Sequence, residues 1–196
     1  MPASPEAWRC FVAVPAPPDL RLALEDAVAG WRREAGAPDL RWADPAGWHL
    51  TLAFLGQTDA AQIPALAATL DEVVAAAVPF TISTGRLGAF PRPGAALSAW
   101  LGIEDLEGHL RDLAAAVQAA VLDPDRRRPL RAHLTLGRSR ARRGEPLAGW
   151  LESRSFPAMP IGVSEVVLYR SHLGRGPARY ERLAAAALGG AGSAHG

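Results

Sequence analysis

The sequence contains no lysine, so all 21 of its basic residues are arginine, and it contains a single cysteine, Cys10. One cysteine excludes an intramolecular disulfide and a metal site built from several thiolates. No apolar run reaches about 18 residues, so the sequence predicts no membrane span. A basic segment followed by a long apolar one is also missing at the N-terminus, so we expect no signal peptide and a cytoplasmic protein.

An excess of charge is lacking as well, because the formal net charge is only +1. This value argues against a surface that coats nucleic acid through bulk positive charge. Four arginines nevertheless gather in residues 138–143, a pattern that fits either a solvated loop or an edge that faces RNA. With 196 residues, 49% of them hydrophobic, the chain is long enough for one domain with a substantial core.

A four-residue motif, His-Leu-Thr-Leu, occurs twice, at residues 49–52 and 133–136. Each copy predicts a β-strand, in which side chains alternate between two faces. His49 and Thr51 should therefore share one face, as should His133 and Thr135. The leucines should lie on the opposite, apolar face, together with Phe54. Two such strands facing each other would place two imidazoles across one cleft.

Periodicity and turn residues predict an alternation of strands and helices along the chain. The predicted strands are 8–14, 40–42, 49–56, 79–88, 97–103, 133–136 and 163–173. The predicted helices are 20–31, 63–74 and 106–121, the last with Leu106 in its apolar stripe. A turn is expected at 174–177, and residues 180–188 fit either a helix, by their alanines, or an edge strand. We therefore expect one domain at residues 1–188, with one motif in each half, and a disordered tail at 189–196.

Paired histidines suggest acid–base chemistry, because an unperturbed imidazole has a pKa of about 6.5 and can both accept and donate a proton near neutral pH. One neutral histidine can take a proton from water while the other, charged, protonates a departing alkoxide. The hydroxyls of Thr51 and Thr135 can donate to phosphate oxygens. This set suits displacement at phosphorus without a metal. The competing metal site lacks a third ligand at a fixed spacing, since Asp44, the nearest acid, lies in a turn.

The two motifs and their flanks resemble the two-histidine phosphoesterases, and within them the LigT-like RNA 2′,3′-cyclic phosphodiesterases. The similarity covers about residues 8–188 and rests on segments 9–14, 48–56, 87–91, 100–102, 129–138, 166–173 and 176–180. It implies a bilobal α+β fold with two antiparallel sheets and flanking helices around a central cleft, related by a pseudo-twofold axis. It further implies hydrolysis of cyclic phosphates at RNA ends to 2′-phosphates without a metal. We also expect a monomer that needs no other cofactor.

The resemblance also implies a role for each motif residue. His49 would be the proton donor and His133 the proton acceptor, while Thr51, Thr135 and Arg138 would bind the substrate. Strict alternation turns Arg138 away from the His133 face, so this residue needs a bulge or a strand end to reach the cleft. The same residues would also serve a 2′–5′ RNA ligase that runs the reaction backwards, or a phosphodiesterase that acts on small cyclic nucleotides. A non-catalytic RNA-binding module is less favoured, because both motifs are intact.

Overall fold

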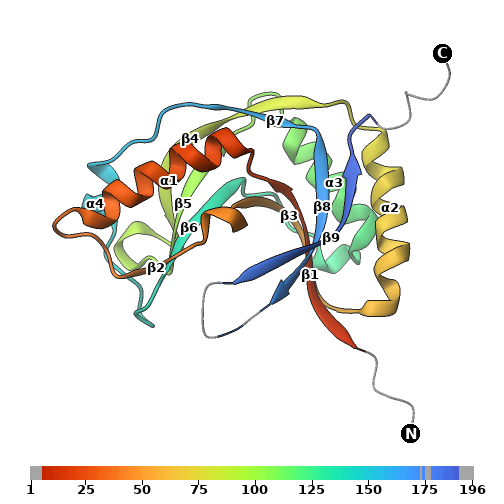
Figure 1. Cartoon of the computed structure of the whole chain (residues 1–196), viewed down its shortest axis with the longest axis horizontal. Helices are drawn as coiled ribbons and strands as arrows, with labels where there is room; N and C mark the ends of the chain where they lie inside the picture. Colours follow the sequence, from red (N-terminus) through yellow and green to blue (C-terminus); the bar gives the residue numbers. More distant parts are fainter. Residues whose placement is uncertain (1–5, 173, 175–177, 190–196) are drawn as a thin grey trace, which may run out of the picture.

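The computed structural model describes residues 6–172, 174 and 178–189, which form two antiparallel sheets with helices packed on them (Figure 1). The strands are β1 (Ala7–Pro15), β2 (Leu40–Trp42), β3 (His49–Asp59), β4 (Phe80–Phe90), β5 (Ser98–Glu104), β6 (His133–Ser139), β7 (Pro160–Val163), β8 (Glu165–His172) and β9 (Arg179–Ala187). The helices are α1 (Pro18–Arg33), α2 (Ile63–Ala75), α3 (His109–Val121) and α4 (Ala148–Glu152). Short 3-10 turns are η1 (Pro45–Gly47), η2 (Ala60–Gln62), η3 (Pro93–Ala95) and η4 (Pro124–Arg126).

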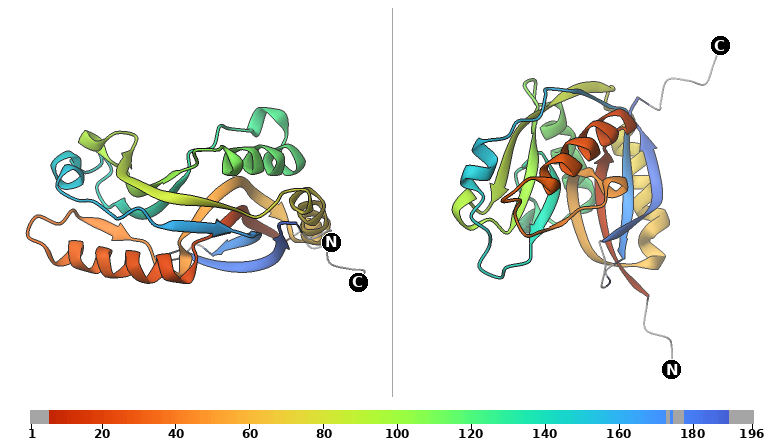
Figure 2. Two further views of the ribbon diagram at one scale, coloured as in Figure 1. Left: turned by 90° about the horizontal axis from the view of Figure 1, so that it is seen from above. Right: turned by 60° about the vertical axis from the view of Figure 1, so that its left-hand side comes forward.

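Each of the two sheets contains one copy of the repeated motif, on β3 in one sheet and on β6 in the other. The four-stranded sheet has the order β3-β1-β8-β9, and the five-stranded sheet has the order β2-β6-β5-β4-β7. Helices α2 and α3 lie against the four-stranded sheet, whereas α1 runs along the five-stranded sheet (Figures 1 and 2). The predicted α+β architecture with two antiparallel sheets and flanking helices is therefore confirmed.

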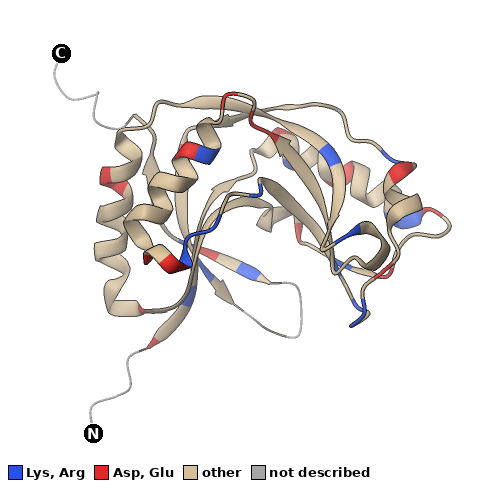
Figure 3. Ribbon diagram, turned by 180° about the vertical axis from the view of Figure 1, so that it is seen from behind, with Lys and Arg blue, Asp and Glu red and all other residues tan. Residues whose placement is uncertain are grey.

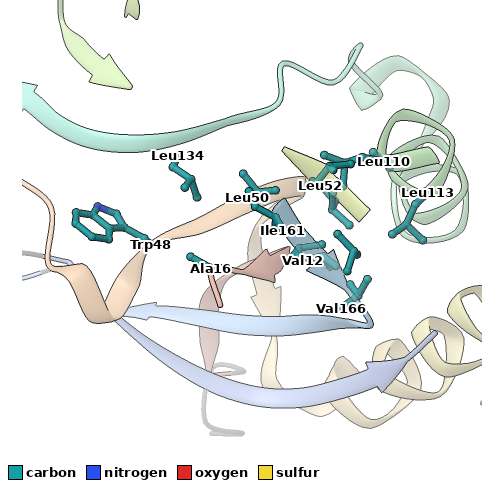
Figure 4. Close-up of a cluster of buried hydrophobic side chains, with 14 of the residues drawn as sticks. Val12, Ala16, Trp48, Leu50, Leu52, Leu110, Leu113, Leu134, Ile161 and Val166 are labelled. Atoms are coloured by element: carbon teal, nitrogen blue, oxygen red, sulfur yellow. The ribbon is translucent and has the colours of Figure 1, made fainter. Parts of the chain in front are cut away.

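One hydrophobic core joins the sheets behind the motif strands. Leu50 and Leu52 of β3 and Leu134 and Leu136 of β6 are all at most 2% exposed and belong to the same cluster. Figure 4 shows Leu50 and Leu134 within this cluster, between the two strands that carry them. Burial of a leucine side chain stabilises the fold by roughly 1.5–3 kcal/mol, so these four residues hold the motif strands firmly against a shared core.

Several element boundaries differ from those predicted. The segment predicted as one strand, residues 163–173, is two strands: β7 ends at Val163 in the five-stranded sheet and β8 begins at Glu165 in the other. Leu106 is 93% exposed and precedes α3, because Gly108 at φ +78° ends the turn and the helix starts only at His109. Strand β3 does not stop at Gly56, which adopts φ +74° within the strand, and β4 runs two residues past its predicted end.

The ambiguous segment at residues 180–188 is a strand. Its alanines favour a helix by propensity, but β9 pairs with β8 along its whole length, and Ala186 is buried on the core side. Helix α4 and strand β7 were not predicted. Residue 173, the last three residues of the predicted turn (175–177) and most of the predicted tail (190–196) lie outside the described residues.

Candidate active site

Each motif strand carries a β-bulge at the same place, directly after its threonine. Ala13 of β1 pairs with Thr51, but its neighbour Val12 pairs with Ala53, which leaves Leu52 as the extra residue. In the other sheet Trp100 pairs with Thr135 and Ala99 with Gly137, which leaves Leu136 as the extra residue. A bulge shifts the alternation of side chains by one position.

The bulges turn Phe54 and Arg138 onto the histidine faces of their strands. Leu52 and Ala53 are buried in succession and Phe54 is 63% exposed, so the predicted place of Phe54 on the leucine face is wrong. Arg138 is exposed after buried neighbours in the same way, so the bulge it needed is present. Phe54 and Arg138 each follow the motif histidine by five positions, and they are therefore equivalent residues with different chemistry.

Each of the two histidines is held by a hydrogen bond of the same kind. Nδ1 of His49 lies 2.6 Å from the carbonyl oxygen of Gly47, and Nδ1 of His133 lies 2.5 Å from that of Arg131. A carbonyl oxygen only accepts, so each Nδ1–H donates and each Nε2 is the free nitrogen. Both imidazoles therefore present the nitrogen that can accept or deliver a proton, in matching orientations relative to their strands.

Aromatic side chains pack around both imidazole rings. The ring centroid of His49 lies 4.7 Å from Phe11 and 5.0 Å from Tyr180, which meets it edge-on. The centroid of His133 lies 5.0 Å from Phe90, also edge-on, and 6.2 Å from Trp100. Such contacts, in the range favoured by aromatic pairs, limit the ring orientations that each histidine can adopt.

Burial lowers the pKa of both histidines below the usual value of 6.5. The hydrogen bond to the carbonyl opposes this effect in each case. Positive charge on His133 further lowers the pKa of His49, so the two imidazoles lie within electrostatic range of each other. The guanidinium groups of Arg138 and Arg131 further lower the pKa of His133. Both histidines are consequently neutral near pH 7 in the free protein.

Several arginines gather around this pair although the chain as a whole is nearly neutral. Arg138 lowers the pKa of Tyr180, against the stronger effect of burial, and Arg9 acts in the same direction. Tyr180 is on β9 and Arg138 is on β6, so the charge of the Arg138 guanidinium in one sheet affects a side chain of the other sheet. Arg131 lies 5.5 Å from the Phe90 ring centroid. Elsewhere arginines and acids are interspersed along helices and strands, as Figure 3 shows.

The remaining predicted site residues lie next to the histidines. Thr51 and Thr135 are partly buried two positions beyond them on the same strand faces. Beyond Arg138, the basic segment is partly neutralised, because Arg140 forms an ion pair with Asp39 at 3.2 Å. Within the described ranges no three His, Cys, Asp or Glu side chains gather as a metal site would require. No described helix combines the length and apolarity needed to cross a membrane.

Several residues that surround the histidines were not predicted from the sequence. Phe11, Tyr169 and Tyr180 form an aromatic cluster on the face of the four-stranded sheet that carries His49. Arg9 adds positive charge near Tyr180, and Arg131 adds positive charge near His133. Their approach depends on which strands pair, and the only signal in the sequence was the alternation of Arg9 and Phe11 along the first strand.

Comparison with known proteins agrees with this geometry. Residues 14–97 match the family model of the LigT like Phosphoesterase. An RNA 2′,3′-cyclic phosphodiesterase of Archaeoglobus fulgidus is 32% identical over 157 residues, which cover 78% of this chain and 86% of that protein. A second protein of that name, from Geobacillus stearothermophilus, is 31% identical over 92% of this chain, which spans only 57% of the relative's length.

Solved structures show the same arrangement. The crystal structure of a Thermus thermophilus protein superposes with a TM-score of 0.71 at 26% identity, covering 92% of this chain and 98% of that one. The structure of E. coli LigT complexed with 3′-AMP gives a TM-score of 0.69 at 26% identity, covering 93% and 99%. Sequence and fold thus agree, and the chain belongs to the LigT-like phosphoesterases.

Proposed function

We propose that this protein hydrolyses 2′,3′-cyclic phosphates at RNA ends to 2′-phosphates. The observation that carries the proposal is the matched pair of histidines, each oriented by an Nδ1–H bond to the carbonyl two residues earlier and each followed by a threonine on the same face. The relatives named RNA 2′,3′-cyclic phosphodiesterases supply the substrate class. Both lines of support point to the same reaction by independent routes.

The two histidines divide the proton transfers. His133, neutral because burial and the neighbouring arginines lower its pKa, takes a proton from the attacking water through Nε2. The bond between the water oxygen and phosphorus forms as the bond to the ribose 3′-oxygen breaks. His49 then delivers its proton to that oxygen, which leaves as a hydroxyl. The proton lost by the water and the proton gained by the ribose keep the overall balance.

His49 must be protonated before the reaction, although burial keeps it neutral in the free protein. A bound cyclic phosphate carries negative charge, and an opposite charge a few ångströms away raises the pKa of a histidine. Substrate binding therefore favours the protonated form of His49, the proton donor. The hydroxyls of Thr51 and Thr135 and the guanidinium of Arg138 stabilise the charge that develops on the non-bridging oxygens.

Phe54 and Arg138 occupy equivalent places in the two halves, and both side chains can contact a bound nucleotide. Phe54 is an exposed aromatic side chain on the His49 face, where a nucleobase can stack. Arg138 is a cation on the His133 face and attracts phosphate. The direction of the sugar comes from the resemblance to the LigT-like phosphodiesterases: we propose that the 3′-oxygen faces His49, so that the product retains its 2′-phosphate.

The site needs only one copy of the chain and no cofactor in this proposal. His49 and His133 come from the two halves of a single molecule, so we propose a monomer in which residues 1–188 act as one domain. Residues of both halves lie in one continuous core, in support of that assignment. Light scattering after gel filtration at working concentration checks the oligomeric state.

The test uses an oligonucleotide that ends in a 2′,3′-cyclic phosphate. We expect the wild-type protein to give a 2′-phosphate, resolved from the 3′-isomer by phosphorus NMR. His49→Ala and His133→Ala should each lower turnover by roughly 10²–10⁴-fold, and the double variant should be little worse. His109→Ala, at the exposed start of α3, is the control and should keep the wild-type rate. Near-normal turnover in either motif variant, folded by circular dichroism, contradicts the proposal.

A further inference from the structure

A pocket of about 430 Å³ opens directly beside His49. Its walls come from the start of α1, from η1 and from the strands β8 and β9. Neither His133 nor the two motif threonines line it, so this pocket is a flank of the reaction site and not the reaction site itself. A volume of this size falls in the range of small-molecule subsites.

The side chains of the pocket combine aromatic surface with two arginines and the carboxylate of Glu165. Tyr169 and Tyr180 line it, and each also lies near His49, with ring centroids at 6.1 and 5.0 Å. Arg182 lines it but is already bound to Glu165, whose carboxylate oxygens accept hydrogen bonds of 3.0 and 2.8 Å. Arg21 of α1 also lines the pocket, and its guanidinium forms no ion pair within the part of the chain that the structure describes.

Arg21 is therefore the cation that remains available in this pocket. It is partly buried, and it lies close enough to Tyr169 to favour the ionised phenol electrostatically. An arginine with free donors binds phosphate through paired hydrogen bonds. The pocket thus has the chemistry of a phosphate subsite bordered by two aromatic rings.

Ribose connectivity indicates which phosphate would enter this pocket. The oxygen that His49 protonates is bonded to C3′ of the terminal ribose. C3′ is bonded to C4′, which carries C5′ and, through it, the phosphodiester to the preceding nucleotide. The base is attached at C1′, on the other side of the ring. When the 3′-oxygen faces His49, the upstream phosphodiester leaves the ribose on the His49 side, where the pocket opens.

We propose that this pocket binds the phosphodiester on the 5′ side of the terminal nucleotide, with Arg21 as its contact. The inference rests on the proposed function, because it requires the 3′-oxygen to face His49. The inference also distinguishes two classes of substrate, because an RNA end offers this phosphodiester, whereas a nucleoside 2′,3′-cyclic phosphate does not. The protein therefore selects RNA ends over small cyclic nucleotides through a group outside the reaction centre.

The experiment compares three substrates that share the same reacting group. They are adenosine 2′,3′-cyclic phosphate, the dinucleotide ApA ending in a 2′,3′-cyclic phosphate, and that dinucleotide with a neutral methylphosphonate in place of the phosphodiester. We expect wild-type kcat/KM to be about tenfold or more higher for the charged dinucleotide than for the mononucleotide. The neutral linkage should remove most of that preference.

Two variants of α1 complete the test. Arg21→Ala should lower the preference for the charged dinucleotide about tenfold and leave little difference between the charged and neutral linkages. Arg32→Ala, an exposed arginine in the last turn of the same helix, is the matched control and should keep the wild-type preference. The methylphosphonate comparison needs no variant, so it stands even if Arg21→Ala fails to fold.

The outcomes separate the two proposals. If the wild-type protein hydrolyses all three substrates with equal kcat/KM, the subsite is wrong and the proposed function stands. An equal loss on all three substrates in Arg21→Ala likewise contradicts the subsite, because it shows a structural role. If the wild-type protein hydrolyses none of them, the proposed function fails and the subsite fails with it.

Discussion

Replacement of Arg138 by alanine tests the consequence of the β-bulge in β6. The bulge places this exposed guanidinium on the His133 face, where its charge lowers the pKa of His133. The substitution should therefore have two effects: the substrate phosphate loses a charged hydrogen-bond donor, and the pKa of His133 rises toward its usual value.

The size of the first effect follows from the exposure of the side chain. A hydrogen bond to a charged group contributes about 1.5–3 kcal/mol, and an exposed pair lies at the low end of that range because water screens it. A loss of about 1.4 kcal/mol lowers kcat/KM about tenfold. The sign of the second effect is fixed: the base must be neutral, so a higher pKa of His133 moves the acidic limb of the pH–rate profile to higher pH.

The assay is kcat/KM for a cyclic-phosphate dinucleotide, measured from pH 4 to 9. Arg138→Ala should be slower by about tenfold with its acidic limb shifted upward, while Arg138→Lys should keep the limb and recover part of the rate. Arg140→Ala is the control, since Arg140 is exposed and bound to Asp39. An Arg138→Ala profile that matches the wild type in both height and position would refute the placement of this charge at the phosphate.

Other features of the site give further expectations. Because the pKa values of both histidines are lowered, the wild-type kcat/KM profile should be a bell centred below pH 6.5, and the kcat profile should lie at higher pH because bound phosphate raises both; a rate that climbs steadily to pH 10 would contradict this. Activity should survive EDTA, and loss with rescue by zinc or manganese would replace the mechanism by metal-assisted hydrolysis. A Cβ at Gly88 would lie 2.2 Å from the Trp100 ring, so Gly88→Ala should destabilise the protein by about 1–3 kcal/mol in urea unfolding, whereas Gly162→Ala, with open space around it, should not.

The fold class followed from the sequence because its signals are local. Both motif strands showed alternating apolar residues, and helices α1 and α2 showed buried residues at helical spacing, such as Leu20, Leu24 and Val28. The α+β architecture and the family followed from these patterns and from the repeated motif. Strand β9 resisted prediction because alanine favours a helix, and only pairing with β8 overrides that preference.

The bulges explain why the site was only partly predictable. Alternation from His49 places Phe54 among the leucines, and alternation from His133 turns Arg138 away. One extra residue in each strand reverses both assignments, and its presence depends on the neighbouring strand, which supplies one partner where the motif strand supplies two. A pattern of side chains within one strand contains no information about that count.

The pocket beside His49 was also beyond the reach of the sequence. Arg21, Tyr169 and Tyr180 come from α1, β8 and β9, and they converge only because β8 pairs with both β1 and β9. Composition offered one hint, since every basic residue is an arginine. Which of the 21 arginines face a substrate is decided by sheet order and ion pairs, such as the one that binds Arg182 to Glu165.

In the proposed mechanism His49 protonates the leaving oxygen and His133 activates the water. A substrate with sulfur in place of the bridging 3′-oxygen tests it most directly, because a thiolate, with a pKa near 8.5 for an ordinary thiol, leaves without needing a proton. Turnover of this cyclic phosphorothiolate and of the normal cyclic phosphate would be measured with wild type, His49→Ala and His133→Ala. We expect sulfur to restore the turnover of His49→Ala by about 10²-fold or more relative to the oxygen substrate and to leave His133→Ala impaired. Restoration of His133→Ala instead, or of neither variant, would contradict the assignment.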